Sequence, residues 1–357
     1  MLRHARYLGM LALVAGACRG VGDQTESVAR TGAAAPSGVP KSALADEAAP
    51  STEGDFPQRI HAAARAASVR SRPFAIVEAC TPPARAKARD VGAASDVVYV
   101  TRDGKPLRLD VTWPLDGATH PLVLLVHGGA WVGGDRLYHR DDAEKLAGAG
   151  FVAATIDYRL AGPPGAAFPA PLQDLRCAVR FLRERSADYR IDPRRVGAIG
   201  DSAGGHLVAM LATADDLADD ASCPAGGTSR IQSAVVDYAP LDLRASRSYP
   251  PSIQLAMRIL LGADPAADAD RAAWASPITH LDAGDPPLLI VHAAHDRTVP
   301  VESSRAFAEA ATRAGVRSLY LELASPSLGH GFLVLGSGEV LRRSTCTTMA
   351  FLASTLR

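Results

Sequence analysis

The chain has 357 residues, 47% of them hydrophobic, and its 38 Lys and Arg residues are balanced by 38 Asp and Glu residues. This length and composition suit one large domain with a tail, since α/β domains of about 250 residues are common. The basic residues are scattered along the sequence and do not gather into a stripe, which excludes the usual footprint of a nucleic-acid-binding protein. We therefore expect no nucleic-acid partner.

The first 18 residues have the three-part pattern of a secretory signal peptide. A positively charged start is followed by apolar residues 8–14 and by small residues at Ala15 and Ala17. This apolar stretch is too short to span a membrane. Either an ordinary signal peptidase cuts here, or the segment is a bacterial lipoprotein signal and Cys18 is the lipid anchor; we favour the second, because a polar stretch follows the cysteine. We expect an exported protein, held in the cell envelope or secreted.

Residues 19–93 are predicted to be a flexible linker and N-terminal extension. Up to about residue 70 they are rich in Ala, Gly, Ser, Thr and Pro and show no sustained hydrophobic period, which is typical of a tether. Between residues 71 and 92, apolar side chains and Cys80 could attach the extension to the folded part. Residues 94–357 are the predicted catalytic domain.

Four cysteines remain besides Cys18: Cys80, Cys177, Cys223 and Cys346. In an exported protein they could form two disulfides with three possible connectivities. Cys177 lies in an apolar helical pattern and could instead be a packed thiol. None of them has metal-ligand spacing, so we expect no metal site.

The predicted domain opens with two antiparallel strands and then alternates strands with helices. Strands are predicted at 97–100, 107–113, 122–126, 151–156, 196–199, 231–236, 288–292 and 319–323. Helices are predicted at 141–149, 172–185, 206–210, 253–261, 301–313 and from Gly331 onward. Such alternation indicates an α/β fold with a mostly parallel, doubly wound sheet and flanking helices. Residues 243–284 form a longer excursion, which we interpret as a small cap insertion over the site.

A strand, a sharp turn and a helix are predicted around Gly200-Asp-Ser-Ala-Gly204. This is the context of a Gly-x-Ser-x-Gly nucleophile elbow, in which a strained turn projects the serine hydroxyl and the flanking glycines avoid collisions. Ser202 is the candidate nucleophile. The five residues alone could also arise by chance in a chain rich in Ala and Gly, so the rest of the sequence must supply the partners.

Two candidate partners follow predicted buried strands. Asp296 follows the strand at 288–292, and His330 follows the strand at 319–323. In a doubly wound sheet, ligands bind beyond the carboxyl ends of the strands, so these side chains are expected to meet Ser202 there. The order Ser, Asp, His is that of α/β-hydrolases. Asp242, which also follows a strand, is a weaker alternative for the acid.

From about residue 97 onward the chain resembles the α/β-hydrolase superfamily, and within it the esterases related to hormone-sensitive lipase and the bacterial feruloyl and acetylxylan esterases. The resemblance rests on His127-Gly-Gly-Ala-Trp131, Asp157-Tyr-Arg159, Phe168-Pro-Ala-Pro-Leu-Gln-Asp174, Gly200-Asp-Ser-Ala-Gly-Gly205, Asp296-Arg-Thr-Val-Pro300 and Gly329-His-Gly-Phe332. Any one of these motifs alone is weak evidence, but six of them in the order found in the family are specific evidence.

The resemblance implies a two-step acyl transfer in which His330 takes the proton of Ser202 and Asp296 orients His330. The amides of Gly128, Gly129 and Ala203 are the expected oxyanion hole. Ala130 stands where related sequences have a third glycine, so a positive φ there would strain the loop. Trp131 is a candidate substrate-binding residue, although an aromatic side chain there could only pack the loop.

We therefore expect a serine carboxylesterase that needs no cofactor and acts on a small-molecule or polysaccharide-linked ester. An acetylxylan or feruloyl esterase, a formamidase and a peptidase related to prolyl oligopeptidase are alternatives, the last disfavoured because the chain has no length for a propeller domain. A surface-anchored binding protein that keeps the hydrolase scaffold without turnover is a further alternative, which the complete triad disfavours.

Overall fold

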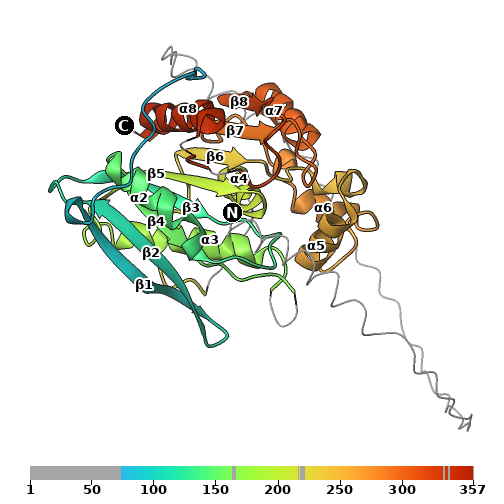
Figure 1. Ribbon diagram of the computed structural model, residues 1–357. Helices are drawn as coiled ribbons and strands as arrows, with labels where there is room; N and C mark the ends of the chain where they lie inside the picture. Colours follow the sequence, from blue (N-terminus) through green and yellow to red (C-terminus); the bar gives the residue numbers. More distant parts are fainter. Residues whose placement is uncertain are drawn as a thin grey trace, which may run out of the picture. The chain divides into compact units, whose positions relative to one another are not determined.

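Figure 1 shows the computed structural model of the chain, which describes residues 74–162, 166–215, 217, 222–332, 334–336 and 338–356. The predicted signal segment, the lipid anchor at Cys18 and most of the predicted linker lie outside these residues. Residues from Phe74 to the C-terminus belong to one compact unit.

The compact unit is built around one sheet of eight strands in the order β1-β2-β4-β3-β5-β6-β7-β8. The strands are β1 (Val91–Arg102), β2 (Lys105–Pro114), β3 (His120–Val126), β4 (Val152–Ile156), β5 (Ile191–Asp201), β6 (Ser233–Asp237), β7 (Leu288–Ala293) and β8 (Ser318–Leu323). β2 pairs antiparallel with β1 and β4, and all other neighbours are parallel. The predicted α/β class is confirmed.

Helices cover both faces of the sheet (Figure 1). They are α2 (Arg140–Gly148), α3 (Ala170–Glu184), α4 (Ala203–Thr213), α5 (Pro251–Leu261), α6 (Ala269–Trp274), α7 (Glu302–Ala314) and α8 (Glu339–Leu356), with short 3-10 helices η1 (Ala88–Asp90), η2 (Arg136–His139), η3 (Leu243–Ser248) and η4 (Pro277–Thr279). The closing helix predicted from Gly331 begins only at Glu339, and Gly331 itself has a φ of 83°, which a helix does not accept.

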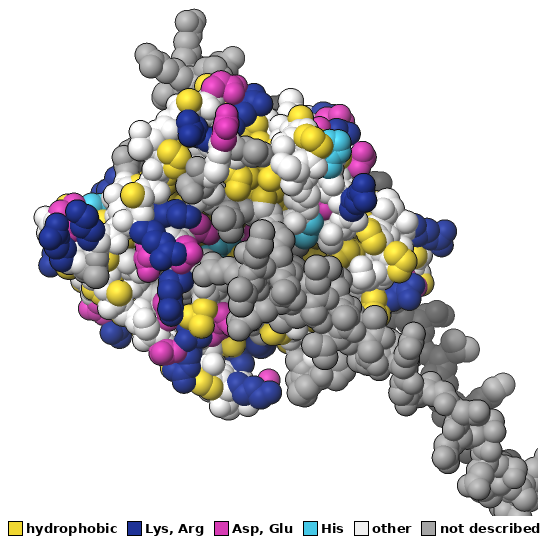
Figure 2. All heavy atoms as spheres, viewed as in Figure 1, with side chains coloured by type: hydrophobic (Ala, Val, Ile, Leu, Met, Phe, Trp, Pro, Cys, Tyr) yellow, Lys and Arg dark blue, Asp and Glu magenta, His cyan; other side chains and the backbone are white. Residues whose placement is uncertain are grey.

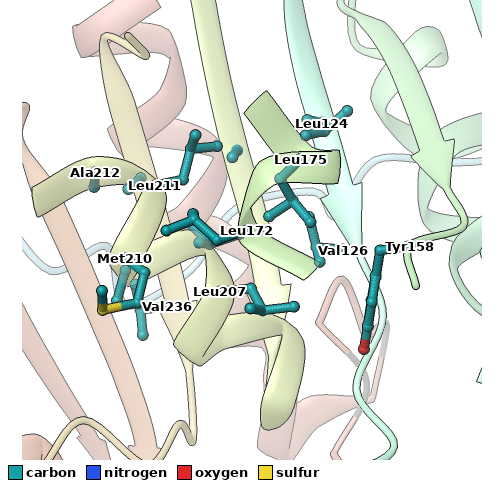
Figure 3. Packing of buried hydrophobic residues seen from close by; sticks show 14 of the residues in the cluster. Leu124, Val126, Tyr158, Leu172, Leu175, Leu207, Met210, Leu211, Ala212 and Val236 are labelled. Carbon is teal, nitrogen blue, oxygen red and sulfur yellow. The ribbon is translucent and has the colours of Figure 1, made fainter. Parts of the chain in front are cut away.

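The central strands β3, β4, β6 and β7 are buried on both faces, because alternate side chains enter two different cores. On β3, Leu122, Leu124 and Val126 face the core formed with α3, α4 and α7. Val123 and Leu125 face the core formed with α2 and α8. Figure 3 shows the first core, in which leucines of α3 and α4 lie beside Leu124 and Val126. This packing fixes the ends of β3 and β5, where the predicted site lies.

Two disulfides join the four cysteines of the described chain, Cys80 to Cys346 and Cys177 to Cys223. Cys177 is therefore bonded as well as packed, since it is fully buried in α3. The first disulfide, with Phe74 packed edge-on against Phe351 of α8, ties the N-terminal extension to the last helix. The predicted domain boundary at residue 94 falls inside β1, because the fold continues upstream of it.

The described helices include none that is both long and apolar enough to cross a membrane. On the face shown in Figure 2, Lys and Arg side chains stand beside Asp and Glu side chains. Many charged side chains of the described residues form ion pairs. Arg136, for example, contacts three carboxylates, those of Asp96, Asp110 and Asp157.

Candidate active site

Ser202 occupies a strained turn between the end of β5 and the start of α4. Its φ of 51° and ψ of −118° lie in a region of backbone conformation that residues other than glycine rarely adopt. The flanking glycines make the turn possible, because a Cβ on Gly200 would lie 2.3 Å from the Gly204 oxygen and one on Gly204 would lie 2.1 Å from the Val126 oxygen. The strand, turn and helix predicted from the sequence are all present.

The structure brings Ser202, His330 and Asp296 together. The Nε2 atom of His330 lies 2.9 Å from Ser202 Oγ, and its Nδ1 atom lies 2.7 Å from Asp296 Oδ2. Since a carboxylate only accepts hydrogen bonds, Nδ1 carries the proton and Nε2 is left to accept the serine proton. The ring of Tyr238, 4.9 Å away and edge-on, packs beside His330. The three groups can therefore act as nucleophile, base and orienting acid.

Asp296 is held from four directions. The amides of Thr298 and Val299 donate to Oδ1 at 2.8 and 3.0 Å, while His330 and His292 contact Oδ2 at 2.7 and 3.2 Å. The other ring nitrogen of His292 lies 2.7 Å from Ser304 Oγ. Burial raises the pKa of Asp296, but the hydrogen bonds of His292 and His330 outweigh it and hold the pKa below its ordinary value. Asp296 is therefore ionised at neutral pH.

The alternative acid, Asp242, does not reach this group. Its carboxylate caps η3 through the amide of Arg244 and forms an ion pair with the Arg244 guanidinium at 2.8 Å. The structure thus gives Asp242 a local role at the start of the cap insertion.

Of the three amides predicted for the oxyanion hole, that of Gly128 is already used. Its N–H donates to Asp201 Oδ1 at 2.9 Å inside the protein. The prediction for Gly128 is therefore wrong, because a committed donor is not available to a substrate oxygen. The amides of Gly129, Ala130 and Ala203 have no acceptor within the described residues.

Ala130 does adopt the positive φ that its position requires. Its φ is 53°, and that of the following Trp131 is 62°. Two consecutive residues with a Cβ in this region cost about 1–2 kcal/mol each. The loop holds this conformation through the Ala161 amide, which donates to the Trp131 oxygen at 2.8 Å, and through the Val132 and Gly133 amides, which donate to the Gly129 oxygen.

Trp131 lies in the core instead of facing a pocket, with 1% of its surface exposed. Its indole N–H donates to His206 Nδ1 at 3.2 Å. The structure therefore contradicts the predicted substrate contact and supports the packing role. Almost none of the indole surface is therefore accessible to a substrate.

A buried ionic cluster beneath the nucleophile was not expected from the sequence. His139 lies 2.9 Å from Asp201 Oδ1 and 3.0 Å from Asp142 Oδ2, and all three side chains are buried. Tyr238 donates to Asp201 Oδ2 at 3.2 Å. Its hydroxyl also lies 3.0 Å from the Phe332 oxygen, two residues beyond His330. The cluster therefore connects the elbow, the Gly128 loop and the segment after His330.

The same cluster shifts the protonation of its members. Burial lowers the pKa of His139, but hydrogen bonds and charges from Asp142 and Asp201 outweigh it and raise the pKa to about 10. Burial, together with the charge on Asp201, raises the pKa of Asp237 well above its ordinary value. The carboxyl oxygens of Asp237 have no hydrogen-bond partner among the described residues. At neutral pH the cluster thus holds a charged imidazolium on His139, between the carboxylates of Asp142 and Asp201.

We expect the protein to lose stability as the pH rises from 7 to 10, because the folded-state pKa of His139 lies above its ordinary value of about 6.5. The stability that the protonated His139 contributes is fully present below its ordinary pKa and is lost as the pH rises to about 10. The loss amounts to about 3 kcal/mol by linkage, measured as the pH dependence of urea unfolding.

Other groups also titrate in this range, so the variant His139→Gln isolates the effect: it should be less stable at pH 7 and show a flatter alkaline slope. His120→Gln, which removes a histidine paired with Asp116 at the start of β3, should keep the full slope. An equal slope in all three proteins would contradict the assignment.

A serine on the turn after β5, with its partners beyond β7 and β8 and a sheet of this order, defines the α/β-hydrolase class. The BD-FAE family model matches residues 109–311, more than half of the chain. The chain belongs to this family of α/β-hydrolase esterases.

Curated relatives include two proteins of Mycobacterium tuberculosis. Esterase LipC is 33% identical over 222 residues, which cover 60% of this chain and 54% of LipC. Probable carboxylic ester hydrolase LipM is 30% identical over 263 residues, covering 70% of this chain and 59% of LipM. The matched part thus spans little more than half the length of these relatives.

Among solved structures, the butyrate-bound esterase 2 of the planctomycete Thermogutta terrifontis is 30% identical, with a TM-score of 0.59 over 73% of this chain and 92% of that chain. The Bacteroides eggerthii protein described as a bifunctional GH43-CE is 25% identical, with a TM-score of 0.61 over 73% of this chain and 38% of that chain.

Proposed function

We propose that this chain is an exported serine carboxylesterase with Ser202 as nucleophile, His330 as base and Asp296 as orienting acid. The observation that carries the proposal is the unbroken hydrogen-bonded path from Ser202 Oγ through both nitrogens of His330 to Asp296. Each of the three residues follows a different strand of one sheet. The rigid core therefore fixes the positions of the three side chains relative to one another.

In the first step the Ser202 oxygen attacks the ester carbonyl while His330 Nε2 takes the hydroxyl proton. The tetrahedral intermediate collapses as the carbon–oxygen bond to the alcohol breaks and His330 returns the proton to the leaving alcohol. In the second step His330 takes a proton from water, the hydroxide oxygen attacks the acyl-serine, and Ser202 regains its proton as the acid leaves. Asp296 stays ionised and stabilises the imidazolium in both steps.

The negative charge on the carbonyl oxygen needs donors near Ser202. Ala203 supplies the first amide of α4, whose N-terminal dipole also favours an anion. The amides of Gly129 and Ala130 supply the opposite side, in place of the Gly128 amide. Loss of one such donor typically lowers the rate by about 100-fold or more.

Short acyl esters are the proposed substrates. The 30% identical Thermogutta terrifontis esterase 2 has been solved with butyrate and with propionate bound. We expect the purified protein to hydrolyse p-nitrophenyl acetate and butyrate at least about 10-fold more efficiently than p-nitrophenyl octanoate. Initial rates on this panel, as kcat/KM, test the proposal.

Covalent labelling separates an enzyme from a binding protein on the same scaffold. A fluorophosphonate probe should modify the protein with 1:1 stoichiometry, and peptide mass spectrometry should find the adduct on Ser202. A protein that neither hydrolyses the panel nor reacts with the probe would contradict the proposal and favour the binding alternative.

A carbohydrate-linked acetyl ester is a second candidate, favoured by Trp274. This side chain is 37% exposed on α6 and packs edge-on against Phe168 at 4.8 Å, and exposed indoles can stack on sugar rings. Acetylated xylan and methyl ferulate therefore belong in the panel. A preference for acetylated xylan that is lost in Trp274→Ala, with p-nitrophenyl acetate unaffected, would support this candidate.

Export is proposed from the signal pattern of residues 1–18 and is supported by two disulfides, Cys80–Cys346 and Cys177–Cys223. Structural disulfides are typical of proteins that leave the cytoplasm. Mass spectrometry of the mature N-terminus distinguishes a lipidated Cys18 from the unmodified Cys18 that ordinary signal-peptidase cleavage after Ala17 leaves.

A further inference from the structure

His206 connects helix α4, which begins with the Ala203 amide, to the loop that carries the amides of Gly129 and Ala130. It lies on α4 one turn after Ser202, and its amide donates to the Ser202 oxygen at 3.0 Å. Its side chain is fully buried. The helix start that supplies the Ala203 amide therefore also carries this imidazole into the core.

The imidazole makes one hydrogen bond on each side. Nδ1 accepts the indole N–H of Trp131 at 3.2 Å, and the Trp131 ring stands edge-on to it at 5.2 Å between centroids. Nε2 lies 2.8 Å from the backbone oxygen of Ala275, which follows α6 in the cap insertion. One residue of α4 thus holds both the Gly129–Trp131 loop and the cap.

These two partners allow a single protonation form. An indole only donates and a carbonyl only accepts, so Nδ1 must be bare and Nε2 must carry the proton. Burial lowers the pKa of His206 to about 4, although the bond to Ala275 opposes this shift. The imidazole is therefore neutral at pH 7, and its Nδ1 atom stays available to accept the indole N–H of Trp131.

The loop needs such a tie because it is strained. Ala130 and Trp131 both have positive φ values, and a conformation of this kind persists only where the surroundings fix it. Backbone bonds hold the loop to itself and to Ala161. The Trp131–His206 bond fixes it to α4, the element that carries the opposite donor.

We propose that His206 is a positioning residue that sets the spacing between the Ala203 amide and the amides of Gly129 and Ala130. This inference rests on the proposed esterase function. Donors that act on a transition-state charge must be placed to within a fraction of an ångström, so loss of the tie should lower kcat more than it changes KM.

Two variants separate the two bonds of His206. His206→Asn keeps an acceptor near the position of Nδ1 and loses the bond to Ala275, whereas His206→Gln keeps a donor near the position of Nε2 and loses the acceptor for Trp131. With p-nitrophenyl acetate we expect His206→Gln to lower kcat about 10- to 100-fold with KM within about twofold. His206→Asn should keep kcat within about threefold of the wild type.

Trp131→Phe removes the same bond from the other side and keeps an aromatic ring. It should lower kcat as much as His206→Gln, and the double variant should show no further loss, since both changes delete one interaction. Phenylboronic acid, which forms a tetrahedral adduct on an active-site serine, should bind more weakly by a similar factor.

His280→Gln is the matched control, because His280 contacts the Trp274 oxygen in the same insertion at 2.9 Å. It should leave kcat unchanged. Thermal unfolding shows which variants fold; if His206→Gln does not, Trp131→Phe still tests the same bond. Full kcat in Trp131→Phe, equal losses in His206→Asn and His206→Gln, or additive losses in the double variant would each overturn the inference. A wild-type protein without hydrolysis would instead overturn the proposed function.

Discussion

The variant Ser202→Ala is expected to lower kcat for p-nitrophenyl butyrate by about 10⁴-fold or more, with KM within about threefold of the wild type. The substitution removes the only atom that forms the acyl bond and leaves the backbone donors of the oxyanion hole in place. Fluorophosphonate labelling should disappear. Rates must be corrected for spontaneous hydrolysis, which sets the lower limit of the measurement.

Ser354→Ala is the matched control. The Ser354 hydroxyl donates to the Phe351 oxygen at 2.8 Å within α8, so its loss should leave kcat and labelling unchanged. The fold should survive both changes. If Ser202→Ala kept the parental rate and the probe label appeared on another serine, the proposed nucleophile would be wrong.

The sheet and the positions of Ser202, Asp296 and His330 were predictable because local patterns specify them. Buried parallel strands appear as continuous apolar runs, and the ends of such strands are where ligand-binding side chains lie. Gly200 also acts locally, because a Cβ there would meet the backbone oxygen of Gly204, four positions along the chain. These features need no knowledge of distant contacts.

The roles of Gly128 and Trp131 were not predictable, because both depend on contacts across the fold. The Gly128 amide is used by Asp201, which is 73 positions away, and the indole of Trp131 by His206, which is 75 positions away. A partial signal did exist for Asp201, since an acidic residue at the end of a buried strand needs partners. Nothing in the local sequence identifies His139 as that partner.

His292 is not among the candidate site residues that the sequence indicates, and the structure places it behind Asp296. It shares Oδ2 with His330 and is itself fixed by Ser304. An acid held between two histidines and two amides has little freedom to rotate. The precision of the site therefore depends on residues that the motif alone does not contain.

This arrangement makes Asp296→Asn the second large expected effect, a loss of kcat of about 10⁴-fold. The amides of Thr298 and Val299 donate to Oδ1, so the side-chain oxygen of the asparagine should stay with them. Its NH₂ group then faces His330 in place of Oδ2. A donor at that position favours the ring form with the proton on Nε2, which has no lone pair to accept the proton of Ser202.

The matched control is Asp242→Asn, which changes the acid that the structure pairs with Arg244. It should keep kcat within about threefold of the wild type. In Asp296→Asn the rate of fluorophosphonate labelling should fall together with kcat, because both reactions need the same deprotonated serine oxygen. Near-normal labelling of Asp296→Asn would show that His330 keeps the right form without the carboxylate. A loss of kcat in Asp242→Asn but not in Asp296→Asn would identify Asp242 as the orienting acid. The hydrogen-bonded path from Ser202 to Asp296 would then have no catalytic role.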